Sequence, residues 1–350
     1  MDTASHMQED GMSVKVGING FGRIGRLALR ECLERRDMEV MAINNRQMEI
    51  EYFAYLLRND TVHGRFGGSI DILNKNTLSV NGKHIHVFTE DKAESIEWEA
   101  AGAEYIIEST GVNKTVDKCA PHFEHGAKKV IISAPSDDAP TFVMGVNHHD
   151  YNREMNVVST ASCTTNCLAP LCKIIHEEYG IAEGIMTTVH SMTASQNTVD
   201  GSSRRDWRGG RSATDNIIPS KTGAAKALTK VMPELKGKIH CTSLRVPTLD
   251  VSVINLAVRL ETASSFEDIK GTMRDAAENP LWHRIIGYSD ELAVSSDFRT
   301  EYKTCVFDAD ASASLNENFH LLVAWYDNEW GYTNNMLDFV KHMAKTDARK

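Results

Sequence analysis

Cys163 and His190 are the two residues of this chain whose types and positions favour nucleophilic chemistry. Cys163 lies in the segment Ala-Ser-Cys-Thr-Thr-Asn-Cys, residues 161–167, which leads into apolar residues at helical spacing. That spacing predicts a helix beginning at or near Cys163, and the positive end of a helix dipole favours a thiolate. Residues 186–190 form a β-branched segment that ends in His190. A thiol and an imidazole in neighbouring elements can form a thiolate–imidazolium pair.

The other cysteines are expected to be structural. Cys167 lies one helical turn after Cys163 and is expected to face the core. The remaining five stand within apolar patterns, where a small buried side chain is the better interpretation. They are Cys32, Cys119, Cys172, Cys241 and Cys305. No spacing of cysteine and histidine resembles a zinc site, so no metal is expected.

A long polar segment, residues 191–216, follows His190 and carries hydroxyls and arginines. Such groups near a reactive thiol suit an anionic, phosphorylated substrate. Arg245 interrupts an apolar strand and is therefore expected to bind a specific anion. For the loop arginines, solvation or pairing across a subunit interface is the favoured alternative. The residues of this set are Thr193, Arg204, Arg205, Arg208, Arg211, Lys221, Thr222, Gly223 and Arg245.

Gly20, Gly22 and Gly25 have the spacing Gly-x-Gly-x-x-Gly between a predicted strand and a predicted helix. Glycines there permit a tight turn and a close approach of a ligand to the backbone. The helix N-terminus offers free N–H groups to a pyrophosphate. The alternative is a tight strand–helix turn that binds nothing. The context favours a Rossmann-type dinucleotide site.

The acidic residue that often follows such a motif is missing, because the second predicted strand ends Asn44-Asn45-Arg46. A carboxylate would accept hydrogen bonds from ribose hydroxyls and would repel a 2′-phosphate. An amide does not repel it, and Arg46 could attract it. Discrimination of NAD from NADP is therefore expected to be weakened. An equally weighted alternative is that Asn45 binds the ribose and that Arg46 is solvated.

The pattern of strands and helices expected along the chain predicts an α/β protein. The first half alternates strand-like and helix-like segments, which indicates right-handed βαβ units and a parallel sheet. In the second half, long apolar alternation with short connections indicates an α+β domain with a mostly antiparallel sheet. Strands are expected near residues 14–18, 39–44, 105–108, 129–133, 249–260, 304–308, 311–315 and 320–326, and helices near 23–36, 265–277 and 334–345.

The domain boundary is predicted just before Cys163. Residues 13–162 are expected to form the NAD(P)-binding domain and residues 163–330 the catalytic domain. The C-terminal helix, within residues 331–350, is expected to return to the first domain. Residues 1–12 are polar and are expected to be a disordered arm or a tag remnant.

The amino-acid composition and net charge argue against several classes of protein for this chain, namely disordered, membrane-spanning, secreted and nucleic-acid-binding proteins. The 350 residues are 41% apolar and 25% charged, which is typical of globular proteins and too apolar for disorder. The net charge of −10 makes nucleic-acid binding an unfavoured expectation. No apolar run approaches the ~18 residues of a membrane span, and no signal peptide is expected. Seven cysteines indicate a reducing compartment, with the cytoplasm as the default.

Several segments together resemble the phosphorylating glyceraldehyde-3-phosphate dehydrogenase family. They are residues 17–26, 161–167, 187–190, 222–226 and 325–332. The resemblance runs over about residues 14–345, and the heptapeptide around Cys163 is highly specific to that family. The amino-acid sequence of residues 206–211, Asp-Trp-Arg-Gly-Gly-Arg, resembles that of eukaryotic, and in particular fungal, members of the family.

The resemblance implies a reaction and a role for each site residue. Glyceraldehyde 3-phosphate would be oxidised with NAD, or NADP, and inorganic phosphate to 1,3-bisphosphoglycerate, as in glycolysis. Cys163 would form a thiohemiacetal and then a thioester, with His190 as the base. Thr193 and Arg245 would bind the substrate phosphate, and Ser162, Thr164, Thr222, Gly223 and Arg211 the inorganic phosphate. The cofactor would contact Asn19, Gly20, Gly22, Arg23, Ile24, Asn45, Arg46, Ser133, Asn328 and Tyr332. A homotetramer is implied, with residues 191–216 packing near a neighbour's cofactor.

Departures from the family's usual residues leave alternatives open. Asn45 stands where aspartate is usual, Arg46 where proline is common, and Ser202 where proline is frequent. Others are Asn113, Ser195, Asn197 and Lys221. The chain could be a drifted glycolytic enzyme or a specialised paralogue with altered cofactor use or tolerance to a thiol-reactive inhibitor. An erythrose-4-phosphate dehydrogenase and a catalytically silent scaffold are further alternatives, ranked lower.

Overall fold

The computed structural model describes residues 13–203 and 206–349. The predicted arm, residues 1–12, and the loop arginines 204 and 205 lie outside the described residues. The described chain forms two compact units. The first contains residues 13–140, 152–159 and 340–349, and the second contains residues 141–151 and 160–339.

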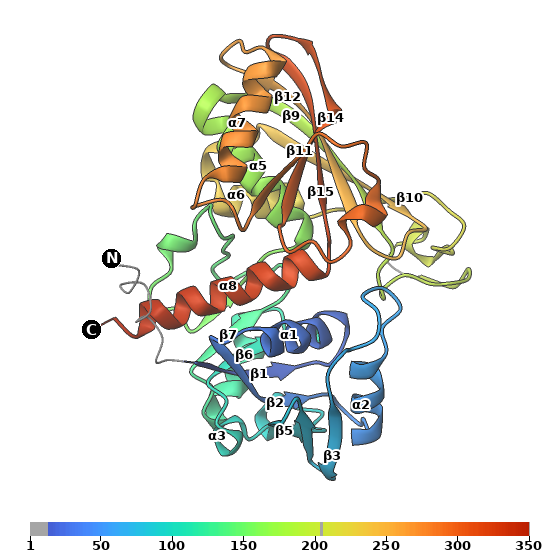
Figure 1. The fold of residues 1–350 in the computed structure, drawn as a ribbon, viewed down its shortest axis with the longest axis vertical. Coiled ribbons are helices and arrows are strands. Elements are labelled where there is room, and N and C mark those ends of the chain that lie inside the picture. Colours follow the sequence, from blue (N-terminus) through green and yellow to red (C-terminus); the bar gives the residue numbers. More distant parts are fainter. Residues whose placement is uncertain (1–12, 204–205, 350) are drawn as a thin grey trace, which may run out of the picture. The chain divides into compact units, whose positions relative to one another are not determined.

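The first unit is built on a parallel sheet that grows from one βαβ unit (Figure 1). Strand β1 (Val14–Asn19) leads through α1 (Arg23–Glu34) to β2 (Met38–Asn44), which pairs with β1 in parallel as predicted. The spatial order β3-β4-β5-β2-β1-β6-β7-β8 changes direction between β1 and β6. Ligands of open α/β sheets bind at such a switch point, beyond the carboxyl ends of the strands.

The remaining elements of this unit flank that centre. The strands are β3 (Ile70–Asn74), β4 (Thr77–Val80), β5 (Lys83–Phe88), β6 (Tyr105–Glu108), β7 (Lys129–Ile132) and β8 (Val157–Ser159). The helices are α2 (Ile50–Arg58), α3 (Trp98–Ala101), α4 (Val116–Cys119) and the 3₁₀ helix η2 (Ala120–His125). The antiparallel edge formed by β3, β4 and β5 was not predicted, because its strands are only four to six residues long and their apolar residues are not all buried.

The second unit contains a mostly antiparallel sheet in the order β10-β11-β9-β12-β15-β14-β13. Its parallel pairs are β11 with β9 and β13 with β14. The strands are β9 (Ile181–Ser191), β10 (Ile218–Ser220), β11 (Ile239–Val246), β12 (Ser252–Leu260), β13 (Ile286–Ser289), β14 (Cys305–Asn316) and β15 (Phe319–Tyr326). The fold class predicted from the sequence is therefore confirmed.

Three helices, α5 (Cys163–Tyr179), α6 (Ala224–Val231) and α7 (Phe266–Glu278), pack on this sheet (Figure 1). Apolar side chains of α5, such as Leu168, Leu171 and Ile175, are fully buried in the same hydrophobic core as Leu256 and Phe307 of the sheet. Burying one such side chain contributes about 1.5–3 kcal/mol, so the helix that carries Cys163 is firmly held. Helix α8 (Trp330–Asp347) has residues in both units.

Two strand boundaries differ from the predicted ones. Strand β12 begins at Ser252 rather than near residue 249, because Val251 has a φ of 65° that extended backbone does not allow. The predicted strands at 304–308 and 311–315 are one strand, β14, with a register irregularity between Asp308 and Ala313. None of the described helices has the length and apolar character needed to cross a membrane.

Candidate active site

Cys163 is the first residue of α5, as predicted. Ser162 is the N-cap, and its hydroxyl accepts a hydrogen bond from the Thr165 N–H at 3.2 Å. The preceding Ala161 has a φ of 58°, a left-handed conformation that turns the chain sharply into the helix. Cys163 is partly exposed, whereas Cys167 is fully buried. At the start of the helix the Cys163 thiol is therefore accessible and the Cys167 thiol is buried in the core, as predicted.

His190, near the end of β9, faces that thiol. Its Nε2 lies 3.4 Å from the Cys163 Sγ, within hydrogen-bond reach for sulfur. Its Nδ1 lies 2.7 Å from the Ser191 carbonyl oxygen. The Ser191 carbonyl can only accept, whereas the Arg245 guanidinium, 2.5 Å from the same Nδ1, can only donate, so the contacts of Nδ1 do not assign the ring proton to one nitrogen. The geometry is that of a thiol beside a general base.

The protonation state of this pair differs from the thiolate–imidazolium expectation. Burial and the nearby Arg245 cation lower the pKa of His190 to about 3, so the ring is neutral at neutral pH. Burial raises the pKa of the Cys163 thiol, although Arg245 and the backbone N–H of Thr164 act in the opposite direction. The predicted lowering of the thiol pKa by the helix end is therefore outweighed by desolvation. The resting pair in this structure is a thiol and a neutral imidazole.

Arg245 completes this group from the neighbouring strand. Arg245 on β11 and His190 on β9 are register partners in a parallel pair. The Arg245 Nη1 lies 2.5 Å from the His190 Nδ1 and donates to the Ser191 carbonyl at 3.0 Å. Arg245 is partly buried, and within the described part of the chain its side chain hydrogen-bonds to His190 and the Ser191 carbonyl and to no carboxylate. A desolvated guanidinium of this kind suits an anionic ligand group.

Tyr326, at the end of β15, supports the same site and was not singled out from the sequence. Its hydroxyl lies 3.0 Å from the Thr164 hydroxyl and 2.9 Å from the Thr188 hydroxyl. Its ring meets the His190 imidazole edge-on at 6.0 Å. Tyr326 therefore ties the first turn of α5 to the strand that carries the base. An apolar strand pattern gives no signal for such a role.

Asn328 and Tyr332 lie within the second unit beside the same strands. The Asn328 Oδ1 accepts hydrogen bonds from the Ser191 hydroxyl at 2.8 Å and the Ser252 hydroxyl at 2.7 Å. Both acceptor directions are thus used, and the Nδ2 group is left to donate. The buried Tyr332 hydroxyl donates to the Ala161 carbonyl at 3.2 Å. It therefore supports the turn that precedes Cys163.

The predicted phosphate-binding residues are not all joined to this centre. Thr164 is buried, Ser162 caps α5, and Thr222 and Gly223 precede α6, with the Thr222 hydroxyl accepting from the Ala224 N–H at 3.2 Å. The Thr193 hydroxyl contacts Ser195 at 3.0 Å. Arg211 is exposed and its guanidinium pairs with Asp200 at 2.9 Å within the same loop. This pairing within the loop is neither the solvation nor the pairing across a subunit interface that was expected as the alternative.

A cavity of about 290 Å³ lies at the carboxyl ends of β1, β2 and β6 in the first unit. Gly20 has a φ of 100°, and a Cβ there would lie 2.6 Å from the Thr110 nitrogen. A Cβ on Gly25 would lie 1.9 Å from the Gly20 carbonyl oxygen. Gly22 is the N-cap of α1, has open space around it and leaves the helix N-terminus without a side-chain cap. These features fit a dinucleotide's pyrophosphate.

Asn45 and Arg46 line the same cavity, together with Asn19 and Asn44. The Asn45 Oδ1 accepts a hydrogen bond from the Phe21 N–H at 3.0 Å, so its amide oxygen is engaged by the glycine-rich turn. Sequence reasoning missed other residues of the wall, which are Glu90, Asp91, Lys92, Ala93, Ile96, Ser109, Thr110 and Val112. They follow strands β5 and β6, and their position could be recognised only once the strand order was known.

Three predicted cofactor residues are placed beside this cavity rather than in its wall. Arg23, the first residue of α1, pairs with Asp60. Ile24 follows it and is partly buried. Ser133, just after β7, donates through its hydroxyl to the Glu108 carbonyl at 3.1 Å.

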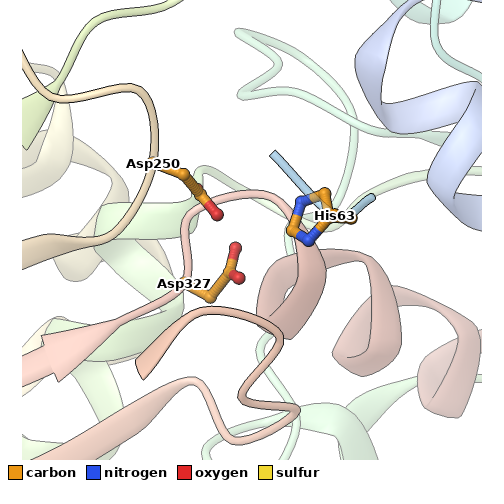
Figure 2. Close-up of side chains that lie close together, drawn as sticks. All are labelled: His63, Asp250 and Asp327. Carbon is orange, nitrogen blue, oxygen red and sulfur yellow. The ribbon is translucent and has the colours of Figure 1, made fainter. Parts of the chain in front are cut away.

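Asp250 and Asp327 are two buried acidic residues of the second unit, next in sequence to Val251 and Asn328. Figure 2 shows their carboxyl groups pointing toward one another. Burial, followed by the charges of Asp327 and Glu329, raises the pKa of Asp250 to about 9. Asp327 accepts from the N–H groups of Glu329 and Trp330 at the start of α8. Asp250 is therefore protonated and Asp327 holds the turn that carries Asn328.

Comparison with known proteins agrees with this arrangement. Residues 14–116 match the glyceraldehyde 3-phosphate dehydrogenase NAD binding domain, and residues 162–328 match the C-terminal domain of the same enzyme family. The chain belongs to the glyceraldehyde-3-phosphate dehydrogenase family.

Relatives in this dehydrogenase family cover almost the whole chain. A cytosolic glyceraldehyde-3-phosphate dehydrogenase of Gracilaria gracilis is 56% identical over 95% of this chain and 98% of its own length. Glyceraldehyde-3-phosphate dehydrogenase 2 of Agaricus bisporus is 54% identical over 96% of this chain and 99% of its own. A chloroplastic glyceraldehyde-3-phosphate dehydrogenase of Arabidopsis thaliana is 55% identical over 95% and 79%, respectively. The predicted family resemblance is confirmed, and NAD is the cofactor.

Proposed function

We propose that this protein oxidises glyceraldehyde 3-phosphate in the presence of inorganic phosphate to give 1,3-bisphosphoglycerate. Relatives that match nearly the whole chain carry the name of this enzyme. The observation that carries the proposal is the 3.4 Å approach of His190 Nε2 to Cys163 Sγ, with the Arg245 cation beside them. NAD supplies the hydride acceptor when it is bound.

Cys163 acts as the nucleophile. His190 Nε2 takes the thiol proton as the sulfur attacks the aldehyde carbon, so the thiolate forms when it is needed rather than in the resting state. The first-turn N–H of α5 at Cys163 is a donor for the oxygen of the resulting thiohemiacetal. The imidazolium returns its proton to that oxygen.

His190 then accepts the hydroxyl proton of the thiohemiacetal while the C1 hydrogen leaves as hydride, and a thioester remains on Cys163. Inorganic phosphate attacks the thioester carbonyl and the sulfur departs. The thioester conserves the free energy of oxidation, which hydrolysis would dissipate. Only a neutral imidazole can accept a proton, and the lowered pKa of His190 keeps the ring neutral at neutral pH while making it a weaker base in the resting site.

The anions are assigned by charge and position. Arg245 and Thr193 hold the substrate's own phosphate. Ser162, Thr164, Thr222 and Gly223 hold inorganic phosphate, with Arg211 joining if it leaves Asp200. For a bound NAD, Asn328 would offer its Nδ2 group to the nicotinamide carboxamide, and the residues of the first unit's cavity would hold the adenosine half.

The wider biological assignment rests on the family. We propose residues 13–162, with the end of α8, as the NAD-binding domain and residues 163–330 as the catalytic domain. A homotetramer, a cytoplasmic location and a glycolytic role belong to the same proposal. Relatives with cytosolic and chloroplastic names both occur.

One observation favours a second cofactor. The wall of the adenosine cavity has an amide at Asn45 and a cation at Arg46 where a carboxylate would exclude a 2′-phosphate. We therefore propose that NADP is accepted alongside NAD. The names of the relatives do not favour an erythrose-4-phosphate dehydrogenase or a silent scaffold.

Initial rates with glyceraldehyde 3-phosphate and inorganic phosphate, comparing NAD with NADP, test both proposals. Cys163→Ser is the control and should abolish the rate, whereas Cys167→Ser should retain it. No rate with either cofactor would contradict the dehydrogenase. A rate with NAD alone would contradict the use of NADP.

A further inference from the structure

Glu108, at the carboxyl end of β6, is a buried carboxylate that the proposed reaction does not use. Its side chain is 2% exposed, yet hydrogen bonds from His122 and Thr110 keep its pKa below the usual range. It is therefore a charged group inside the first unit. A charge in this position is costly unless hydrogen-bond donors surround it.

Every hydrogen bond recorded for the Glu108 carboxylate runs toward it. The Asn19 Nδ2 donates at 2.7 Å, the Thr110 N–H at 2.9 Å and the Asn113 Nδ2 at 3.2 Å, and the Thr110 hydroxyl adds a further short contact. Asn19, Thr110 and Asn113 all line the dinucleotide cavity. The carboxylate thus lies directly behind three residues of the cavity wall.

A chain of hydrogen bonds with fixed donors and acceptors continues from Glu108 across the ends of strands β1 and β2. Asn19 uses its Nδ2 on Glu108, so its Oδ1 is the atom that accepts from the Asn44 Nδ2, at 2.7 Å. The Asn44 Oδ1 in turn accepts from the Glu90 N–H at 2.8 Å. Glu108 therefore orients the Asn19 amide from β6, and the Glu90 backbone orients the Asn44 amide from the segment after β5, because the Asn44 Nδ2 also donates to the Glu90 carbonyl at 3.2 Å.

The other side of Glu108 is fixed by an aromatic pair. The Trp98 indole N–H donates to the His122 Nδ1 at 3.0 Å, which requires a lone pair there. The proton of a neutral His122 is then on Nε2, which donates to Glu108 at 3.1 Å. Trp98 and His122 are both fully buried. No donor of this group can turn round without losing a buried hydrogen bond.

We propose that Glu108 is a positioning residue of the cofactor site, whose carboxylate orients the amides of Asn19 and Asn113 and so sets the hydrogen-bonding pattern offered to the adenosine half of NAD. Glu108 acts through these amides and is not itself part of the cavity wall. The inference rests on the proposed binding of NAD in the first unit.

Glu108→Gln tests this proposal, because it keeps the shape of the side chain but places an NH₂ group among donors. Dissociation constants for NAD and ADP-ribose, measured by calorimetry on the full-length protein, should both rise roughly tenfold or more. In kinetics, the KM for NAD should rise while kcat at saturating NAD and the KM for glyceraldehyde 3-phosphate stay within about twofold. A residue with only a structural role would not produce that split.

Glu104→Gln is the matched control, since Glu104 lies just before the same strand and pairs with Lys128 at 3.0 Å on the surface. It should leave the affinity for NAD unchanged. If Glu108→Gln does not fold, Asn113→Ala removes one donor at the partly exposed rim and should still weaken ADP-ribose binding roughly threefold. Unchanged affinities would overturn the proposal, whereas failure of the parent protein to bind NAD would instead contradict the proposed function.

Discussion

Arg245 and His190 are register partners on the parallel strands β11 and β9, and the Arg245 Nη1 lies 2.5 Å from the His190 Nδ1. The base of the site and its cation are therefore held by sheet hydrogen bonds rather than by loops. A cation beside an imidazole disfavours protonation of the ring, which is one reason for the low pKa of His190. The same arginine can serve an anion only if the strand pair stays intact.

Arg245→Gln should weaken substrate binding more than it weakens NAD binding. Loss of a charge-assisted hydrogen bond to phosphate should raise the KM for glyceraldehyde 3-phosphate roughly ten- to hundredfold. Steady-state kinetics with each substrate varied in turn check this result. An equal change in both KM values would contradict the assignment of Arg245 to the substrate phosphate.

His190→Asn should lower kcat by roughly two to four powers of ten, because it removes the general base while leaving the phosphate ligands in place. The KM for glyceraldehyde 3-phosphate should change little. His176→Asn is a control on the same unit, since the His176 Nδ1 accepts a backbone N–H at 2.8 Å outside the site. Comparable losses of kcat in both variants would argue against a catalytic role for His190.

Asn45→Asp should improve the discrimination of NAD from NADP. A carboxylate at this position would accept from the ribose hydroxyls and repel a 2′-phosphate, so kcat/KM for NADP should fall at least roughly tenfold relative to NAD. The ratio of the two kcat/KM values measures the effect. Gln47→Glu is a comparison that adds the same charge nearby, where Gln47 donates to Asp91 at 3.1 Å. An unaltered ratio in Asn45→Asp would exclude Asn45 as the determinant.

Asp250→Asn should stabilise the fold, and more so as the pH rises. The pKa of Asp250 is raised to about 9, so the folded state holds a proton that the unfolded chain releases near pH 4. Stability is therefore lost between about pH 4 and pH 9, by up to about 1.4 kcal/mol per pH unit. Asparagine resembles the protonated acid and removes that loss. Urea unfolding of both proteins at pH 5 and pH 8 checks the sign, which a larger gain at pH 5 would contradict.

The sequence was sufficient for the local parts of the site. Cys163 at a helix start, His190 at a strand end and the Gly20–Gly25 turn all follow from short-range spacing. What it could not supply came from pairing between distant segments. Arg245 meets His190 only because β11 pairs with β9, and Tyr326 and Ser252 reach the site through β15 and β12. The raised thiol pKa depends on burial, which no local pattern measures.

The chain-wide distribution of thiols has a practical consequence. All seven cysteines are free, and six of them are buried, so only Cys163 is open to a reagent in solution. Burial also raises the pKa of several of the others, among them Cys32, Cys119, Cys172 and Cys241, which suppresses their nucleophilic form. A soluble alkylating agent should therefore add one label per folded chain. Mass spectrometry of the intact protein would then count competent active sites directly, so that the fraction of functional molecules in a preparation can be known before any turnover is measured.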